Sequence, residues 1–190
     1  MGMLAKSNGP NLYLIGFMGV GKSAVGRGVA RLLGMDFVDS DHAIEREEGM
    51  AISEMFARFG ETHFRERERA FVEGGHAARG IVVSCGGGLP LQPGMRERLL
   101  EKGVVVCLFA SVETILSRTL GNDKRPLLQT DNPAERVRTL LAEREPLYLR
   151  TGIGVSTEGR SLSDVMGNVA RIYRRESRRW KGAAGAQHSA

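Results

Sequence analysis

The chain has 190 residues, of which 42% are hydrophobic and 26% charged, and its formal net charge is +5. This length and composition predict a single globular domain with its own hydrophobic core. No apolar run is long enough for a membrane-spanning helix, and residues 1–10 lack the apolar segment of a signal peptide, so we expect no membrane partner. Cys85 and Cys107 each fall in an apolar run, which favours buried thiols in a cytoplasmic protein over a disulfide framework.

Much of the positive charge lies near the C-terminus, between Arg171 and Lys181. Only Tyr173 and Trp180 are aromatic there, too few for a surface on which bases stack. A basic run of this kind is commonly a solvated helix face. We therefore do not expect nucleic acid to be a partner, and we expect residues 177–190 to be a disordered basic tail.

The first predicted elements are a buried strand at residues 11–15, a glycine-rich loop and a helix that ends near Gly34. Residues 16–23 read Gly-Phe-Met-Gly-Val-Gly-Lys-Ser and fit the phosphate-binding pattern G-x-x-x-x-G-K-[ST]. Glycines let successive N–H groups face phosphate oxygens, and the helix N-terminus adds a positive dipole end. Lys22 is expected to reach the β- and γ-phosphates, and Ser23 to offer its hydroxyl to Mg²⁺. The alternative is a glycine turn that binds nothing.

A second short strand is predicted at residues 36–39, and acidic residues lie at its carboxyl end. That end of a parallel strand faces the ligand crevice, so Asp39 and Asp41 can both point toward a triphosphate. Asp39 would orient the waters of Mg²⁺, and Asp41 would accept a proton from an attacking hydroxyl. Alternatively, Asp41 only caps a helix over residues 42–48.

Two helical segments follow, separated at Gly60. Ile52, Met55, Phe56 and Phe59 form a stripe at helical spacing, which predicts a core-facing helix. In the second segment, residues 61–76, Arg65 and Glu68 share a face, and Arg65 is a candidate for binding a carboxylate with its planar guanidinium. The neighbouring charges at positions 66, 67 and 69 are expected to be a solvated face.

A buried strand at residues 81–85 leads directly into three glycines, Gly86, Gly87 and Gly88. Adjacent glycines at a strand end favour a place where a ligand lies against bare backbone, although a plain loop is the alternative. The strand lacks the terminal aspartate of a second nucleotide-binding motif, because Ser84 is in that place. Asp39 would then carry the negative charge beside the metal.

The rest of the chain alternates helices and strands. Helices are expected from Pro93 to Lys102, from Ser111, from Asn132 to a kink or end at Pro146, and from Ser161 or Ser163, with strands at 104–109 and 152–157. The polar segment 118–128 is predicted to be a loop that opens and closes, with Arg125 able to contact the transferring phosphoryl group. The alternative for Arg125 is a surface arginine before a turn. No histidine has metal-ligand spacing.

Six motifs in this order resemble the shikimate kinase family across residues 11–175. They are the glycine-rich loop, Asp39-Ser-Asp41 with Ile44-Glu45, Phe64-Arg65-x-x-Glu68, the glycine triplet, Arg125-Pro-Leu-Leu128 and Arg144-x-Pro-Leu-Tyr148. The resemblance implies an α/β, three-layer P-loop NTPase fold with a five-stranded parallel sheet of order 2-3-1-4-5. It also implies transfer of the γ-phosphoryl group of ATP, with Mg²⁺, to the 3-hydroxyl of shikimate.

The resemblance implies roles for individual residues. Asp41, Lys22 and Arg125 would be catalytic, and Ser23 and Asp39 would serve the metal. Shikimate would be bound by Asp41, Arg65, Gly86, Gly87, Gly88 and Arg144. ATP would be bound by Gly19, Val20, Gly21, Lys22, Ser23, Ala24, Arg118 and Arg125. Adenine contacts from residues 157–160 have no clear match.

The predicted organisation is a mobile lead-in at residues 1–10 and one kinase domain at 11–176. Within that domain we expect a substrate-binding region at about 39–76 and a lid at about 118–131, and we expect a monomer. Two other functions remain open: a P-loop kinase for another hydroxylated acid such as gluconate, and a nucleotide-switched regulatory or nucleic-acid-binding protein.

Overall fold

The computed structural model describes residues 8–119 and 132–180. The sheet consists of β1 (Asn11–Ile15), β2 (Asp36–Asp39), β3 (Ile81–Ser84), β4 (Gly103–Phe109) and β5 (Ile153–Ser156). The strands are all parallel in the order β2-β3-β1-β4-β5, which confirms the predicted sheet. In the register, Asp39 lies beside Ser84 and Ile15 beside Cys107, so the carboxyl ends of the strands form one edge. The helices are α1 (Lys22–Leu33), α2 (Ser40–Glu48), α3 (Ile52–Gly74), the 3-10 turn η1 (Leu89–Leu91), α4 (Met95–Lys102), α5 (Val112–Thr119), α6 (Pro133–Thr151) and α7 (Leu162–Ser177).

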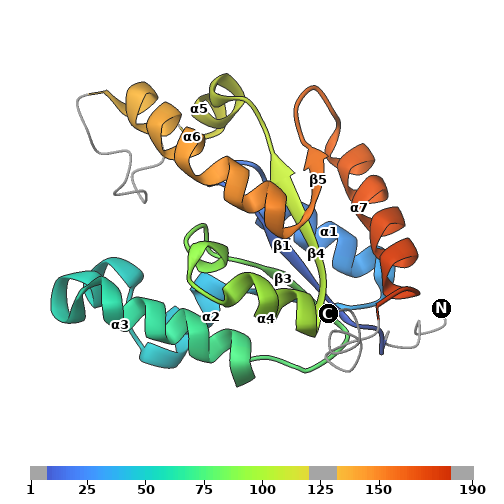
Figure 1. The fold of residues 1–190 in the computed structure, drawn as a ribbon, viewed down its shortest axis with the longest axis horizontal. Coiled ribbons are helices and arrows are strands. Elements are labelled where there is room, and N and C mark those ends of the chain that lie inside the picture. Colours follow the sequence, from blue (N-terminus) through green and yellow to red (C-terminus); the bar gives the residue numbers. More distant parts are fainter. Residues whose placement is uncertain (1–7, 120–131, 181–190) are drawn as a thin grey trace, which may run out of the picture.

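Helices cover both faces of the sheet (Figure 1). α1 and α7 pack against each other on one side, where α1 contacts β3 and α7 contacts β4 and β5. α4 and α6 contact β4 on the other side, and α2 and α3 project together from the β2 end. The central strand β1 is buried along its whole length, as expected for a parallel strand with helices on both faces.

Of the two alternatives predicted at Pro146, an end of the helix is wrong, because α6 continues to Thr151 with Pro146 inside it, and a kink stays a prediction. Proline lacks the N–H that a helix interior uses, which costs a hydrogen bond. Here the ring of Pro146 is exposed. The turns on both sides are anchored in the core, by Leu140 and Leu141 before it and by Tyr148 after it. Tertiary packing therefore outweighs the local penalty.

The predicted core-facing stripe at residues 52–59 is confirmed for Ile52 and Met55 and is wrong for Phe56 and Phe59. Met55 is fully buried, but Phe56 and Phe59 are 37% and 51% exposed. The cause is Gly60, whose φ of 78° and ψ of 176° are not helical. Phe56 therefore packs on the ring of Phe64, and Phe59 on His63, with ring centroids 5.1 and 4.9 Å apart, while the outer sides of both phenylalanines remain exposed.

Two helix starts also differ from the predictions. α4 begins at Met95 rather than Pro93, because Gly94 has a φ of 74° that no helix interior accommodates. α2 begins at Ser40 with Asp39 as the residue before it, so Asp41 lies inside the first turn and does not cap the helix.

The predicted start of the last helix is confirmed. α7 starts after Ser161, whose side chain accepts a hydrogen bond from the N–H of Asp164.

Candidate active site

The loop between β1 and α1 has the geometry of a phosphate-binding site. Gly19 and Gly21 have φ values of 79° and 96°, in the left-handed region that favours glycine. Gly21 is the last residue before α1, so the unpaired N–H groups of the helix start open into the loop. The ammonium of Lys22 donates to the carbonyl oxygens of Gly16 at 2.8 Å and Phe17 at 2.9 Å. A cation and helix N–H groups thus face the same space.

Three oxygen-bearing side chains meet beside this loop. Ser23, in the first turn of α1, donates its hydroxyl to Asp39 Oδ2 at 2.7 Å, and its Oγ lies 3.2 Å from Ser84 Oγ. Asp39 ends β2 and Ser84 ends β3, which places them on neighbouring strands at the carboxyl edge. A hydroxyl and a carboxylate are the hard oxygen donors that Mg²⁺ prefers when phosphates and waters complete its shell. In the described ranges no group of three or more His, Cys, Asp or Glu residues could hold a metal without such help.

Asp41 lies in the first turn of α2, close to both the phosphate loop and the glycine triplet. Burial raises the pKa of its carboxyl, the negative charge of Asp39 raises it further, and the positive charge of Lys22 opposes both. Ser40 fixes the local geometry, because its hydroxyl donates to Asp41 Oδ1 at 3.3 Å and accepts from the N–H of Gly86 at 2.8 Å. Asp41 is thus held as a partly desolvated carboxylate.

The glycine triplet gives two charged side chains room to approach the backbone. A Cβ on Gly86 would collide with the carboxylate of Asp41, and a Cβ on Gly88 would collide with the guanidinium of Arg65. The carbonyl of Gly87 accepts a hydrogen bond from the Tyr148 hydroxyl at 2.7 Å. The predicted ligand-facing backbone is therefore lined by an acid on one side and an arginine on the other.

Arg65 is held by two carboxylates of its own helix. Its Nη1 donates to Glu68 Oε2 at 2.6 Å, and its Nε and Nη2 donate to Glu61 Oε1 at 3.1 and 2.7 Å. Glu68 is buried and also accepts from the Gln92 amide at 2.7 Å. Burial raises the pKa of Glu68 to about 7, although Arg65 acts in the opposite direction. The sequence offered no signal for Gln92, which lies far from α3 along the chain.

Arg144 reaches the same place from α6. Its positive charge acts on Tyr148, one turn further along the helix. Burial raises the pKa of Tyr148 to about 12, and the nearby charges of Arg144 and Arg65 both lower it. The Tyr148 hydroxyl therefore feels the charge of both arginines, and their sharing of one carboxylate stays a prediction.

Arg118, at the end of α5, contacts the segment after β5. Its Nη1 donates to Thr157 Oγ1 at 2.9 Å and its Nη2 to the Thr157 carbonyl at 3.1 Å. The pairing brings Arg118 and Thr157 together, although the sequence left residues 157–160 without a clear match. Arg125 and most of the predicted lid lie outside the described residues.

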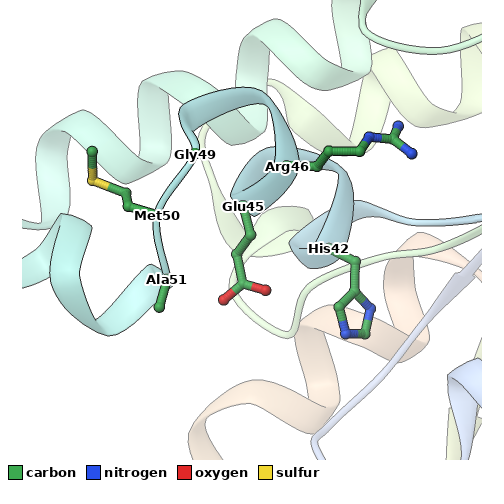
Figure 2. A pocket seen from close by; sticks show the side chains of 6 residues that line it. All are labelled: His42, Glu45, Arg46, Gly49, Met50 and Ala51. Carbon is green, nitrogen blue, oxygen red and sulfur yellow. The ribbon is translucent and has the colours of Figure 1, made fainter.

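A surface hollow lies between α2 and the start of α3 (Figure 2). One of its lining residues, His42, reaches the site described above, because its Nδ1 lies 3.5 Å from Asp39 Oδ1. The Glu45 carboxylate, which points into the hollow, accepts a hydrogen bond from the N–H of Ile52 at 3.0 Å. Glu45 therefore fixes the first turn of α3.

In the described ranges, none of the helices combines the length and apolar character needed to cross a bilayer. The fold and site so far consist of a phosphate loop, two aspartates, a glycine triplet and two arginines at one sheet edge.

Comparison with known proteins adds independent information. The family model described as shikimate kinase matches residues 18–173. The shikimate kinase of Thermodesulfovibrio yellowstonii is 42% identical over 167 residues, which cover 88% of this chain and 96% of that protein. The solved structure of shikimate kinase from Acinetobacter baumannii in complex with shikimate has a TM-score of 0.83 and 38% identity, covering 92% of this chain and 98% of that chain.

A gluconokinase from Sinorhizobium meliloti is also similar in structure, with a TM-score of 0.56 over 90% of this chain and 98% of that chain. At 18% identity this likeness shows the shared fold alone.

Proposed function

The chain belongs to the shikimate kinase family, and we propose that it transfers the γ-phosphoryl group of ATP to the 3-hydroxyl of shikimate, giving shikimate 3-phosphate and ADP. One observation carries this proposal above all. The phosphate loop and the pocket of Asp41, Arg65 and the glycine triplet share one edge of the sheet, and the charge of Lys22 in the loop acts on Asp41 in the pocket.

The phosphate loop would bind the nucleotide. N–H groups of residues 19–24 would hold the phosphates, and Lys22 would move from the Gly16 and Phe17 carbonyls onto the β- and γ-phosphates. Ser23 and Asp39 would hold Mg²⁺, which neutralises charge on the phosphates when bound. Arg118 would lie beside adenine, and Arg125, outside the described residues, would neutralise charge on the transferring group.

The acceptor half belongs to the pocket. Arg65 and Arg144 would bind the shikimate carboxylate through charge-assisted hydrogen bonds, and the backbone of Gly86, Gly87 and Gly88 would lie against its ring. Asp41 would hold the hydroxyls and accept the proton of the 3-hydroxyl. The hydroxyl oxygen then forms its bond to the γ-phosphorus while the bond from that phosphorus to the β,γ-bridging oxygen breaks, and ADP leaves.

The cellular and structural setting is part of the same proposal. We infer a cytoplasmic monomer with one kinase domain at residues 11–176, a substrate-binding region at about 39–76 and a lid at about 118–131. Such a protein would serve chorismate and aromatic amino acid biosynthesis.

The proposal is tested by ADP release with ATP and Mg²⁺ against a panel of shikimate, gluconate, nucleoside monophosphates and no acceptor. We expect turnover with shikimate only. Equal or greater turnover with gluconate would favour a different acid kinase, and turnover without any acceptor would favour a nucleotide-switched protein. Arg65→Ala should weaken shikimate binding, because it removes a charge-assisted pair worth about 2–5 kcal/mol.

A further inference from the structure

The guanidinium of Arg65 already binds a carboxylate at one of its edges. A guanidinium pairs with a carboxylate through two parallel N–H groups, and Nε with Nη2 forms one such edge. In Arg65 both of these nitrogens donate to Oε1 of Glu61, at 3.1 and 2.7 Å. Nη1 donates elsewhere, to Glu68. The edge formed by Nε and Nη2 is therefore occupied by a side chain of the same helix.

The two glutamates on Arg65 are held very differently. The Glu68 side chain is 1% exposed and has a second donor in Gln92. The Glu61 side chain is 65% exposed, and within residues 8–119 and 132–180 it has no hydrogen-bond partner other than Arg65. An exposed pair of this kind contributes little, because water solvates both charges well when they separate. Glu68 is a fixed partner of Arg65, and Glu61 is one that can leave.

The backbone explains why Glu61 points at Arg65. Gly60 interrupts the helical conformation of α3, so Glu61 is the first residue of the second helical part. Arg65 follows four residues later, where a side chain lies directly over the preceding turn. A glutamate placed before its basic partner at this spacing is the favoured order. The non-helical Gly60 thus places the carboxylate of Glu61 beside the guanidinium of Arg65.

We propose that Glu61 is a stand-in for the substrate carboxylate, which occupies the Nε–Nη2 edge of Arg65 in the empty site and is displaced when the substrate binds. This inference rests on the proposed function, which assigns Arg65 to the shikimate carboxylate. Glu61 keeps the guanidinium extended against Gly88, where the substrate needs it. The cost is a competition that lowers the affinity for shikimate and that only a negatively charged ligand overcomes.

The test compares steady-state kinetics of wild type, Glu61→Gln and Glu61→Ala with shikimate as the varied substrate. Removing the competing carboxylate should lower the KM for shikimate about two- to fivefold, the scale of an exposed ion pair, and leave kcat unchanged. Glu54→Gln is the matched control. It removes the same charge from α3, and Glu54 forms an equivalent pair with Arg58 at 2.6 Å, but that pair does not touch Arg65.

A second readout uses the methyl ester of shikimate, which has no negative charge. Its affinity, measured calorimetrically, should be the same for wild type and both Glu61 variants. A raised or unchanged KM for shikimate in folded, active Glu61 variants would overturn the inference while the proposed function stands. Failure of the wild-type protein to phosphorylate shikimate would overturn both the inference and the proposed function.

Discussion

At the scale of single residues, Gly88 controls where Arg65 can lie. Its own backbone has ordinary right-handed dihedral angles, so alanine is tolerated there conformationally. The added Cβ would meet the Arg65 guanidinium, which is the free end of a flexible side chain and can move aside. Gly88→Ala should therefore fold normally and raise the KM for shikimate at least about tenfold, because part of a charge-assisted contact is lost.

The control for this prediction is the same change in an Arg65→Ala background. With the guanidinium gone, Gly88→Ala should have no further effect on the KM, since the two changes act on one contact. Full additivity of the two effects would show that Gly88 acts through something other than Arg65.

Asp41 tests the acceptor side of the chemistry. Asp41→Asn keeps the shape of the side chain but removes a proton acceptor from the transition state. We expect kcat to fall at least about a hundredfold, the scale of a positioned base, with a much smaller change in the KM for ATP. A coupled ADP assay measures both constants. Near-normal turnover would reduce Asp41 to a structural residue.

For single residues, the sequence was enough to predict a role where that role follows from a local pattern. Lys22 and Ser23 lie in a motif with fixed spacing, and Arg65 and Glu68 share a helix face by simple periodicity. Gln92 and Thr157 were beyond such reasoning. Each contacts its partner through the tertiary fold, and a lone glutamine or threonine in a loop has no pattern that predicts what it meets.

At the scale of elements, α3 depends on Gly60. Its dihedral angles fall in a region open essentially only to glycine, and nothing lies within 4 Å of a Cβ placed there. Gly60→Ala should therefore act through backbone strain alone and lower the free energy of unfolding by about 1–3 kcal/mol. Denaturant titration measures this difference.

Gly167, in the middle of α7, provides the opposite case. A methyl group at this position would also meet open space, but the φ of Gly167 is not positive. Gly167→Ala should raise the free energy of unfolding by about 0.5–1 kcal/mol, because alanine loses less entropy in a helix. Equal effects of the two alanines would contradict the assignment of strain to Gly60.

The elements themselves were mostly predictable, because apolar periodicity and glycine stops are local signals. The errors fell where tertiary packing overrides them. From the sequence alone Pro146 looks like a helix end, but α6 has buried side chains both before and after it. Phe56 and Phe59 look like core residues by spacing, but ahead of the kink at Gly60 they pack on the rings of Phe64 and His63 and remain 37% and 51% exposed.

At the scale of the whole molecule, a polar network joins β1 to the segment before β3, at the sheet edge opposite the candidate site. His76 Nδ1 lies 2.9 Å from the Ala77 carbonyl, and the Tyr13 hydroxyl lies 3.3 Å from His76 Nε2. The carbonyl can only accept, so Nδ1 carries the hydrogen and Nε2 of a neutral ring accepts from Tyr13. Burial lowers the pKa of His76 from its ordinary value of 6.5.

This lowered pKa predicts a direction for stability against pH. Below about pH 6.5 the unfolded chain binds a proton at this histidine that the folded chain resists, so stability falls as pH falls toward the folded pKa. Denaturant titrations from about pH 8 to pH 5 should show this loss in wild type and less of it in His76→Gln. Parallel pH profiles of the two proteins would contradict it.

The sheet order followed from the family resemblance rather than from local patterns, because strand adjacency depends on long-range pairing. The joint effect of Arg65 on α3 and Arg144 on α6 on the pKa of Tyr148 likewise depends on the complete fold. These two arginines are far apart in the sequence, and no local pattern predicts that both act on the same tyrosine.

The central claim is that one acceptor lies between the phosphate loop and the pocket of Asp41, Arg65 and Arg144. A crystal structure of the protein with ADP and shikimate tests this most directly. The account predicts the shikimate carboxylate on Arg65 and Arg144, with its hydroxyls on Asp41 and facing the phosphates. Shikimate bound at another surface, with these three side chains unchanged, would contradict it.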